Sequence, residues 1–240
     1  MKITPLVHSP IEVSVEKKFR RWIMDRPIEG LVMGINPFLV ELDDALVLVD
    51  LGVQIEQNGD PWLVRAVKER GFDPSDVTHI LLSHLHKDHL MGLGRMKENS
   101  FAYFFENARV FVQGRELMSA LEQQSQFSYD ADYLNALVHH PRLVQLSENE
   151  GYIHPSIRFV LSGGHSEFHQ VFWFEEKGEI AFYGGDELPQ YGYWKRKIAY
   201  KSDFDGKRAR DLREEWKIKA IEEGWTVLFY HDIKKPLVVF

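Results

Sequence analysis

Six consecutive residues in the first half of the chain contain four side chains that can bind a metal ion. The segment His84-Leu85-His86-Lys87-Asp88-His89 directly follows the apolar run Ile80-Leu81-Leu82. A buried strand that ends at a metal site has this pattern. Without a metal, three imidazoles and a carboxylate at the edge of a core would carry a large desolvation cost. Because coordination turns that cost into binding free energy, the segment predicts metal-dependent chemistry.

The spacing within this segment predicts two adjacent metal positions. Residues two apart on an extended chain project to the same side, so His84 and His86 can converge on one cation. Asp88 and His89 follow where the chain is expected to turn into a helix, and they can reach a neighbouring cation. A structural zinc site more often uses a closed set of cysteines, and this chain has none.

Composition narrows the class of protein. A chain of 240 residues can bury a sizeable core, and we expect one domain over residues 1–240. The formal net charge of −7 argues against a nucleic-acid partner, because such partners need a concentrated basic surface. The absence of cysteine fits a reducing compartment. No apolar run reaches membrane-spanning length, so we expect a cytoplasmic protein without a membrane partner.

Apolar runs and turn residues predict a strand-rich chain with interspersed helices. Strands are expected at residues 38–42, 45–50, 76–83, 109–113, 157–161, 171–174, 180–183 and 225–230, and helices at 61–70, 116–124 and 205–223. The first two strands flank Asp43-Asp44 and form a hairpin, whereas residues 125–140 give no clear pattern. Two sheets that face each other, covered by helices, are the economical packing for this order.

Three further candidate ligands stand just after apolar strands, where loops commonly build sites. His165 follows a strand and two glycines, and two glycines also separate Asp186 from its strand. Glycines allow the backbone to fold tightly around a bound ion. His231 directly follows the strand expected at 225–230. Alone, each residue has the ordinary explanation of a loop or strand end, and Asp186 also that of a turn.

The ordered set resembles the metallo-β-lactamase fold superfamily, whose pattern is His-x-His-x-Asp-His, then a lone His, a lone Asp and a late His. The resemblance covers nearly the whole chain. It implies a four-layer αβ/βα sandwich, of α/β (α+β) class, in which two mixed sheets are flanked by helices. It also implies which residues hold each metal. The first metal would bind His84, His86 and His165, the second would bind Asp88, His89 and His231, and Asp186 would bridge them.

Within the superfamily, the chain resembles the lactonase-like and general hydrolase branches. We therefore expect a metallo-hydrolase that acts on an ester, lactone or related carbonyl of a small molecule. A hydroxide that bridges the two metals would attack, with Asp88 and Asp186 as the catalytic carboxylates. Imidazole and carboxylate ligands fit zinc, our first choice, and also iron or manganese. Relatives of this kind are often homodimers.

Other functions remain open at this point. Many lactonases have a tyrosine three residues after the bridging aspartate, but Pro189 stands there, so Tyr191 or Tyr193 would have to substitute. An iron enzyme of the persulfide dioxygenase kind shares the fold and much of the motif, and a phosphodiesterase of the same fold is a further alternative. A metal-stabilised binding scaffold is the least favoured reading, because structural sites rarely keep such a surplus of ligands.

Overall fold

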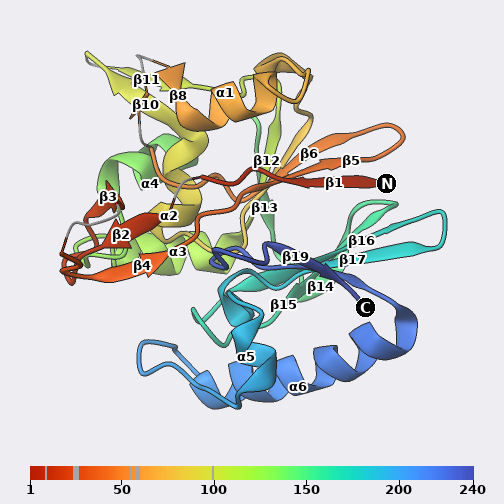
Figure 1. The fold of residues 1–240 in the computed structure, drawn as a ribbon. Coiled ribbons are helices and arrows are strands. Elements are labelled where there is room, and N and C mark those ends of the chain that lie inside the picture. The colour runs from red at the N-terminus through yellow and green to blue at the C-terminus, as the bar shows by residue number, and fades with distance from the viewer. Residues whose placement is uncertain (9, 24–26, 55, 58–59, 99) are drawn as a thin grey trace.

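Two six-stranded sheets pack face to face in the computed structural model, which describes residues 1–8, 10–23, 27–54, 56–57, 60–98 and 100–240 (Figure 1). In spatial order, the first sheet contains β1 (Lys2–Pro5), β5 (Phe38–Glu41), β6 (Leu46–Val49), β9 (His79–Leu81), β12 (Arg109–Gln113) and β13 (Leu143–Leu146). Strands β1, β5 and β6 pair antiparallel, whereas β6, β9, β12 and β13 run parallel. Parallel strands bring their carboxyl ends to one edge, which matters for the site described below.

The second sheet is built from the C-terminal part of the chain. In spatial order it contains β14 (Glu150–His154), β15 (Ile157–Leu161), β16 (Gln170–Glu176), β17 (Glu179–Tyr183), β18 (Thr226–Leu228) and β19 (Leu237–Val239). Only the β17–β18 pair is parallel among the paired strands of this sheet, as far as the described residues show. Both large sheets are therefore mixed, as the family resemblance implies.

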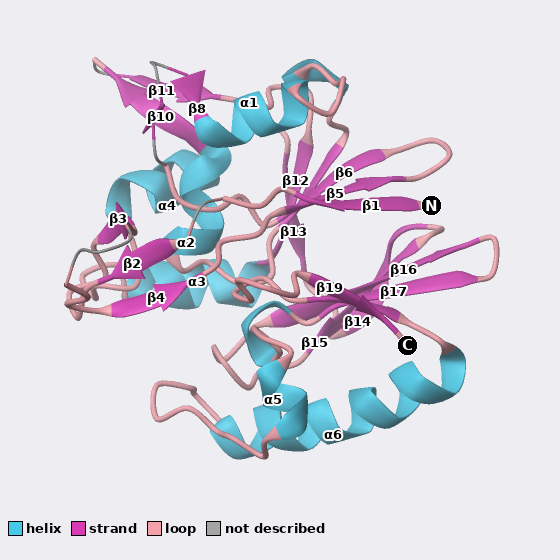
Figure 2. Cartoon of the chain, in the orientation of Figure 1, coloured by secondary structure: helices cyan, strands magenta, loops and turns pink. Residues whose placement is uncertain are grey.

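Helices cover the outer face of each sheet (Figure 2). On the first sheet these are α1 (Trp62–Lys68), α2 (Lys87–Leu90), α3 (Gly114–Glu122) and α4 (Ala131–Val138), and on the second they are α5 (Gly192–Lys195) and α6 (Gly206–Glu223). Strand β6 shows how the layers form. Its Leu46 and Leu48 pack toward the helices, whereas Val47 and Val49 pack between the sheets. This alternation gives the order helix, sheet, sheet, helix, and the expected four-layer αβ/βα sandwich is confirmed.

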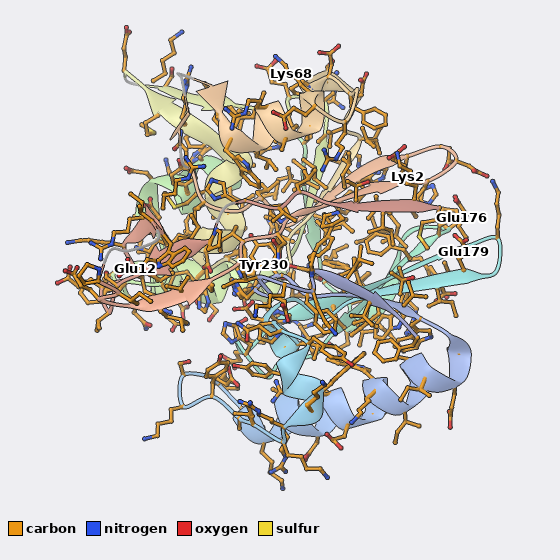
Figure 3. All side chains as sticks on the ribbon, viewed as in Figure 1. Lys2, Glu12, Lys68, Glu176, Glu179 and Tyr230 are labelled. Carbon is orange, nitrogen blue, oxygen red and sulfur yellow. The ribbon has the colours of Figure 1, made fainter. Side chains whose placement is uncertain are left out.

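Smaller elements decorate the sandwich. They are a three-stranded sheet of β2 (Ile11–Val13), β3 (Phe19–Arg21) and β4 (Leu31–Met33), the pairs β7 (Glu56–Gln57) with β8 (Asp60–Pro61) and β10 (Gly94–Lys97) with β11 (Ser100–Tyr103), and the 3-10 turns η1 (Pro74–Asp76), η2 (Met91–Leu93) and η3 (Gly185–Glu187). Figure 3 shows Glu12, in the three-stranded sheet, at the opposite end of the molecule from Lys2 and Glu176. Within the described ranges, no helix combines the length and apolar character needed to cross a bilayer.

The predicted elements are largely confirmed, including the short strands at 109–113 and 157–161, and the differences are short elements that were not predicted. The predicted hairpin forms β5 and β6, and the predicted helix at 205–223 forms α6. The side chain of Asp205 caps α6 by accepting a hydrogen bond from the N–H of Arg208, and Gly224 ends it in the left-handed conformation (φ 70°). The strand predicted at 225–230 is not the last one, because β19 follows it and pairs with it. Residues 125–140, left without a pattern, contain α4, whose first turn is capped by Asp130.

Candidate metal centre

The segment from His84 to His89 leaves the carboxyl end of β9, in the middle of the parallel strands of the first sheet. His84 and His86 lie in the connection before α2, and His86 is the residue that precedes the helix. Asp88 and His89 lie on the single turn of α2 itself. The expected turn into a helix therefore occurs within the six-residue segment, and it separates the two pairs of side chains.

The other three candidates come from the second sheet, at strand ends that meet the same edge. His165 lies in the loop between β15 and β16, Asp186 lies in η3 directly after β17, and His231 follows the strand β18 closely. The structure brings all seven side chains together. Their ligand atoms form three groups, each within 4.8 Å: His84, His86 and His165; His84, His89 and Asp186; and Asp88, His89 and His231.

The first group is made of imidazole nitrogens alone. Nε2 of His84 lies 3.0 Å from Nδ1 of His86, and Nε2 of His165 lies 3.2 Å from that same Nδ1. His84 is fully buried, and only 12% of the side chain of His165 is exposed. Three nitrogens that converge from two sheets in this way form an arrangement that one cation can occupy.

Asp88, His89 and His231 form what we call the second group, which adds a carboxylate, and Asp186 lies between it and the first group. Oδ2 of Asp88 lies 3.6 Å from Nε2 of His231 and 3.9 Å from Nε2 of His89. Oδ1 of Asp186 faces the same two nitrogens, at 3.0 Å from His231 and 3.4 Å from His89. Oδ2 of Asp186 turns the other way, to 3.3 Å from Nε2 of His165. The two oxygens of one carboxylate thus face different groups.

The chemistry of these atoms fits a divalent metal. Burial, reinforced by neighbouring imidazoles, lowers the pKa of His84 and of His86 well below the usual histidine value. Neutral imidazoles have the free lone pairs that coordination needs. Burial opposes the ionisation of Asp186, but His231, His89 and His165 hold its pKa well below the usual carboxyl value. Nε2 of His89 is buried without a hydrogen-bond partner among the described residues, which is what a nitrogen reserved for a metal would show.

A buried carboxylate behind the second group orients one of its histidines. Asp50, the residue after β6, is fully buried and has a positive φ of 51°. Its Oδ2 lies 2.7 Å from Nδ1 of His89 and also accepts hydrogen bonds from the hydroxyls of Ser83 and Tyr183. Its Oδ1 accepts the backbone N–H of Ser83 at 2.8 Å. Such outer partners fix the tautomer and direction of a metal-binding imidazole.

Two buried glutamates hold the backbone around the site, and the sequence did not reveal them. Glu116 of α3 accepts the N–H of Leu85, between the first two histidines, and the hydroxyl of Ser166, beside His165. Glu187 accepts the N–H groups of Gly164 and His165, at 2.7 and 3.1 Å. Both carboxyls have a raised pKa because of burial. No local pattern distinguishes such a glutamate from a solvent-exposed one, so only the packed fold identifies them.

A cavity of about 580 Å³ opens over the site. Its floor includes His86, Asp88, Asp186 and other candidate ligands, and its walls include Leu31, Met33, Pro189, Tyr200 and Phe204. This volume is typical of pockets for small molecules. The lining also has polar side chains, including Gln123, Gln126 and Ser202, so the cavity would suit a substrate that joins a reactive polar centre to an apolar part.

The tyrosines named from the sequence do not line this cavity. Tyr193 is buried, and its ring packs against Tyr200 with centroids 5.1 Å apart. Tyr191 packs against Phe229, at 5.8 Å between centroids. Tyr200 is the tyrosine that lines the cavity. It stands fourteen positions after Asp186, beyond α5, and no local spacing rule connects the two residues.

Comparisons with known proteins agree with the fold. The family model of the metallo-beta-lactamase superfamily matches residues 30–218. An N-acyl homoserine lactonase from Bacillus cereus is 25% identical over 219 residues, which cover 82% of this chain and 81% of the relative. The structure of a probable metal-dependent hydrolase from Staphylococcus aureus has a TM-score of 0.77 at 20% identity, with 100% of this chain and 94% of that chain covered. AidC, described as a dizinc quorum-quenching lactonase, has a TM-score of 0.71 at 22% identity, with 89% and 78% covered.

The family match extends over most of the chain, from before β4 into α6, and so includes six of the seven candidate ligands. His231 lies beyond the matched range, but the structure places it with the others. The similar proteins are hydrolases, which confirms the enzyme class expected from the sequence. The chain belongs to the metallo-beta-lactamase superfamily.

Proposed function

We propose that the chain is a metallo-hydrolase that binds two divalent cations, zinc by first choice, and cleaves an ester or lactone bond of a small molecule. The observation that carries this proposal is the position of Asp186. One of its oxygens faces His165 in the first group and the other faces His231 and His89 in the second. A carboxylate in this position can bridge a pair of metals, whereas a single metal in the first group would use only the oxygen that faces His165.

The chemistry divides between the metals and the protein. Two cations bound here would lower the pKa of a coordinated water and polarise the carbonyl of the substrate. The protein supplies Asp88, which lines the cavity and has one oxygen directed at the histidines. Its other oxygen can accept the proton of the attacking water and return it to the leaving alkoxide. The buried supports Asp50, Glu116 and Glu187 keep the ligands fixed during this exchange, so little reorganisation is needed.

The substrate we favour is an acyl lactone or a related ester with an apolar acyl part. The named relatives are N-acyl homoserine lactonases, although only about a quarter of the residues are identical. Leu31, Met33 and Phe204 provide apolar walls within reach of the metal-binding floor. An apolar chain would bury surface against these walls while its carbonyl meets the site.

Metal analysis and a substrate panel test this function. Protein purified without added metal should contain zinc, and it should cleave N-acyl lactones or aryl esters faster than thioesters or phosphodiesters. Asp88→Asn should lower kcat about 10²–10⁴-fold, because an amide cannot accept the proton, whereas Asp211→Asn, on the exposed side of α6, should have no effect. A single equivalent of iron with oxygen consumption, or activity on phosphodiesters alone, would contradict the proposal in favour of the alternatives named above.

A further inference from the structure

The carboxylate of Asp203 contacts the side of His165 that faces away from the candidate metal centre. Oδ1 of Asp203 lies 2.9 Å from Nδ1 of His165, and the Asp203 side chain is only 1% exposed. The opposite nitrogen of this imidazole, Nε2, points to His86 and Asp186. The second oxygen of Asp203 accepts the backbone N–H of Tyr200 at 3.1 Å. Both oxygens are thus engaged, and the carboxylate has a fixed direction.

The backbone keeps this carboxylate in place. The N–H of Phe204 donates to the carbonyl oxygen of His165 at 3.0 Å, and the N–H of Asp205 donates to the carbonyl oxygen of Gly164 at 2.7 Å. The turn at residues 200–205 is therefore bonded along the loop that contains His165. Because the side-chain contact and the backbone contacts connect the same two segments, Asp203 cannot easily move away from His165.

The contact also determines which nitrogen of His165 is available. An ionised carboxylate only accepts hydrogen bonds, so Nδ1 of His165 must be the protonated nitrogen. Nε2 then has its lone pair directed into the first group. A carboxylate partner of this kind fixes the ring and increases the basicity of the nitrogen that binds the metal.

The two groups of ligands have different outer partners. In the second group, His89 contacts the carboxylate of Asp50. In the first group, Nδ1 of His84 lies 3.1 Å from the hydroxyl of Ser83 rather than from a carboxylate, and His86 directs its Nδ1 inward. Asp203 therefore gives the first group the carboxylate support that Asp50 gives the second. The two supports are separate, which means that each can be removed without the other.

We propose that Asp203 is a positioning residue for the first metal, and that it acts by holding Nε2 of His165 toward that metal. The proposal rests on the proposed function, because it requires two metal positions. It is specific to one of them: loss of Asp203 weakens the first position and leaves the second, which contains His89 and Asp50, nearly unchanged. The sequence gives no indication of this role, since Asp203 stands 38 residues after His165 and outside any ligand pattern.

Metal affinity measured in competition with a chromophoric chelator tests this inference. Metal-free wild-type protein should bind two equivalents of zinc. Asp203→Ala should bind one of the two about 10–100-fold more weakly, the range found when outer partners of metal ligands are removed, and should bind the other within about threefold of wild type. Asp203→Asn should restore most of the loss, because its amide oxygen can still accept from Nδ1 of His165.

Asp205→Ala is the matched control, because Asp205 lies two residues away and caps α6 without contacting a candidate ligand. It should lower the melting temperature but leave both zinc affinities unchanged. The cobalt-substituted proteins give a second readout, since a turned imidazole at one position changes the visible absorption bands of that position. If Asp203→Ala does not fold, Asp203→Asn decides by the same absorption bands. Its amide keeps the ring in place but lacks the charge that increases the basicity of Nε2, so the bands of the first position should shift slightly relative to wild type.

The outcomes separate the two proposals. Two unchanged affinities in Asp203→Ala, or an equal loss at both positions that Asp205→Ala reproduces, would overturn the role of Asp203. An unshifted cobalt spectrum in Asp203→Asn, when that is the only folded variant, would overturn it as well. Wild-type protein that binds fewer than two equivalents would instead contradict the proposed function.

Discussion

Replacement of Asp50 by asparagine tests whether the buried network behind the metal centre stabilises the protein as the structure indicates. The carboxylate accepts four hydrogen bonds: two from Ser83, one from His89 and one from Tyr183. Asparagine keeps the volume, and it tolerates the positive φ of 51° at this position. The substitution therefore changes the hydrogen bonding while the shape of the site stays nearly the same.

The size of the stability loss depends on which of the four donors can change their hydrogen bonding when an amide replaces the carboxylate. If the amide oxygen keeps the backbone N–H of Ser83, the amide nitrogen replaces the oxygen that accepted three donors. The hydroxyls of Ser83 and Tyr183 can rotate to accept instead, but Nδ1–H of His89 cannot. A buried hydrogen bond to a charged group contributes about 1.5–3 kcal/mol, and each neutral one about 1 kcal/mol. We expect the free energy of unfolding to fall by about 3 kcal/mol.

Urea unfolding of the metal-free protein at neutral pH measures this loss. Tyr183→Phe is the matched comparison, because it removes one donor and leaves the carboxylate of Asp50 with three, so we expect a smaller loss of about 1.5 kcal/mol. If Asp50→Asn lowers the free energy of unfolding by less than Tyr183→Phe does, or if both variants leave it unchanged, the hydrogen-bond network of Asp50 does not stabilise the protein.

Three further outcomes follow from other parts of the structure. Arg20, by its hydrogen bonds and charge, lowers the pKa of Glu12 to about 2. Because the unfolded chain binds this proton near pH 4.5, wild type should lose stability relative to Glu12→Gln as the pH falls from 4.5 to 2. Acid-unfolding curves measure this difference, and parallel curves for the two proteins would contradict it. Gly92→Ala would place its Cβ 2.0 Å from the carbonyl oxygen of Leu51, so we expect about 3 kcal/mol of destabilisation by urea unfolding, and an unchanged midpoint would refute the close approach. Phe204→Ala should raise KM for long-chain acyl lactones but not for short-chain ones, and equal effects on both would exclude Phe204 from the acyl pocket.

The candidate ligands could be predicted because their signal is local. Each stands within a few residues of the end of an apolar run, and glycines mark the strand ends before His165 and Asp186. The same holds for long elements such as α6, where a capping aspartate and a final glycine mark both ends. For the strand ends and for α6, the residues that give the signal lie within or directly beside a single element.

The parts that sequence reasoning missed depend on packing between distant segments. The three-residue strands β2, β3 and β4 are too short for their alternation to be recognised, and they form only by pairing with one another. Glu116 and Asp203 reach the candidate site through contacts with loops 31 and 38 residues away in the sequence. Tyr200 reaches the cavity, in place of the tyrosines considered first, because the turn at residues 200–205 lies along the His165 loop.

Metal stoichiometry of Asp186→Ala tests the central claim most directly, because Asp186 is the residue that faces both groups. Wild-type protein should bind two equivalents of zinc, Asp88→Ala should weaken only the position that includes His231, and Asp186→Ala should weaken both. Two tightly bound equivalents and full hydrolytic activity in Asp186→Ala would contradict a bridged pair of metals.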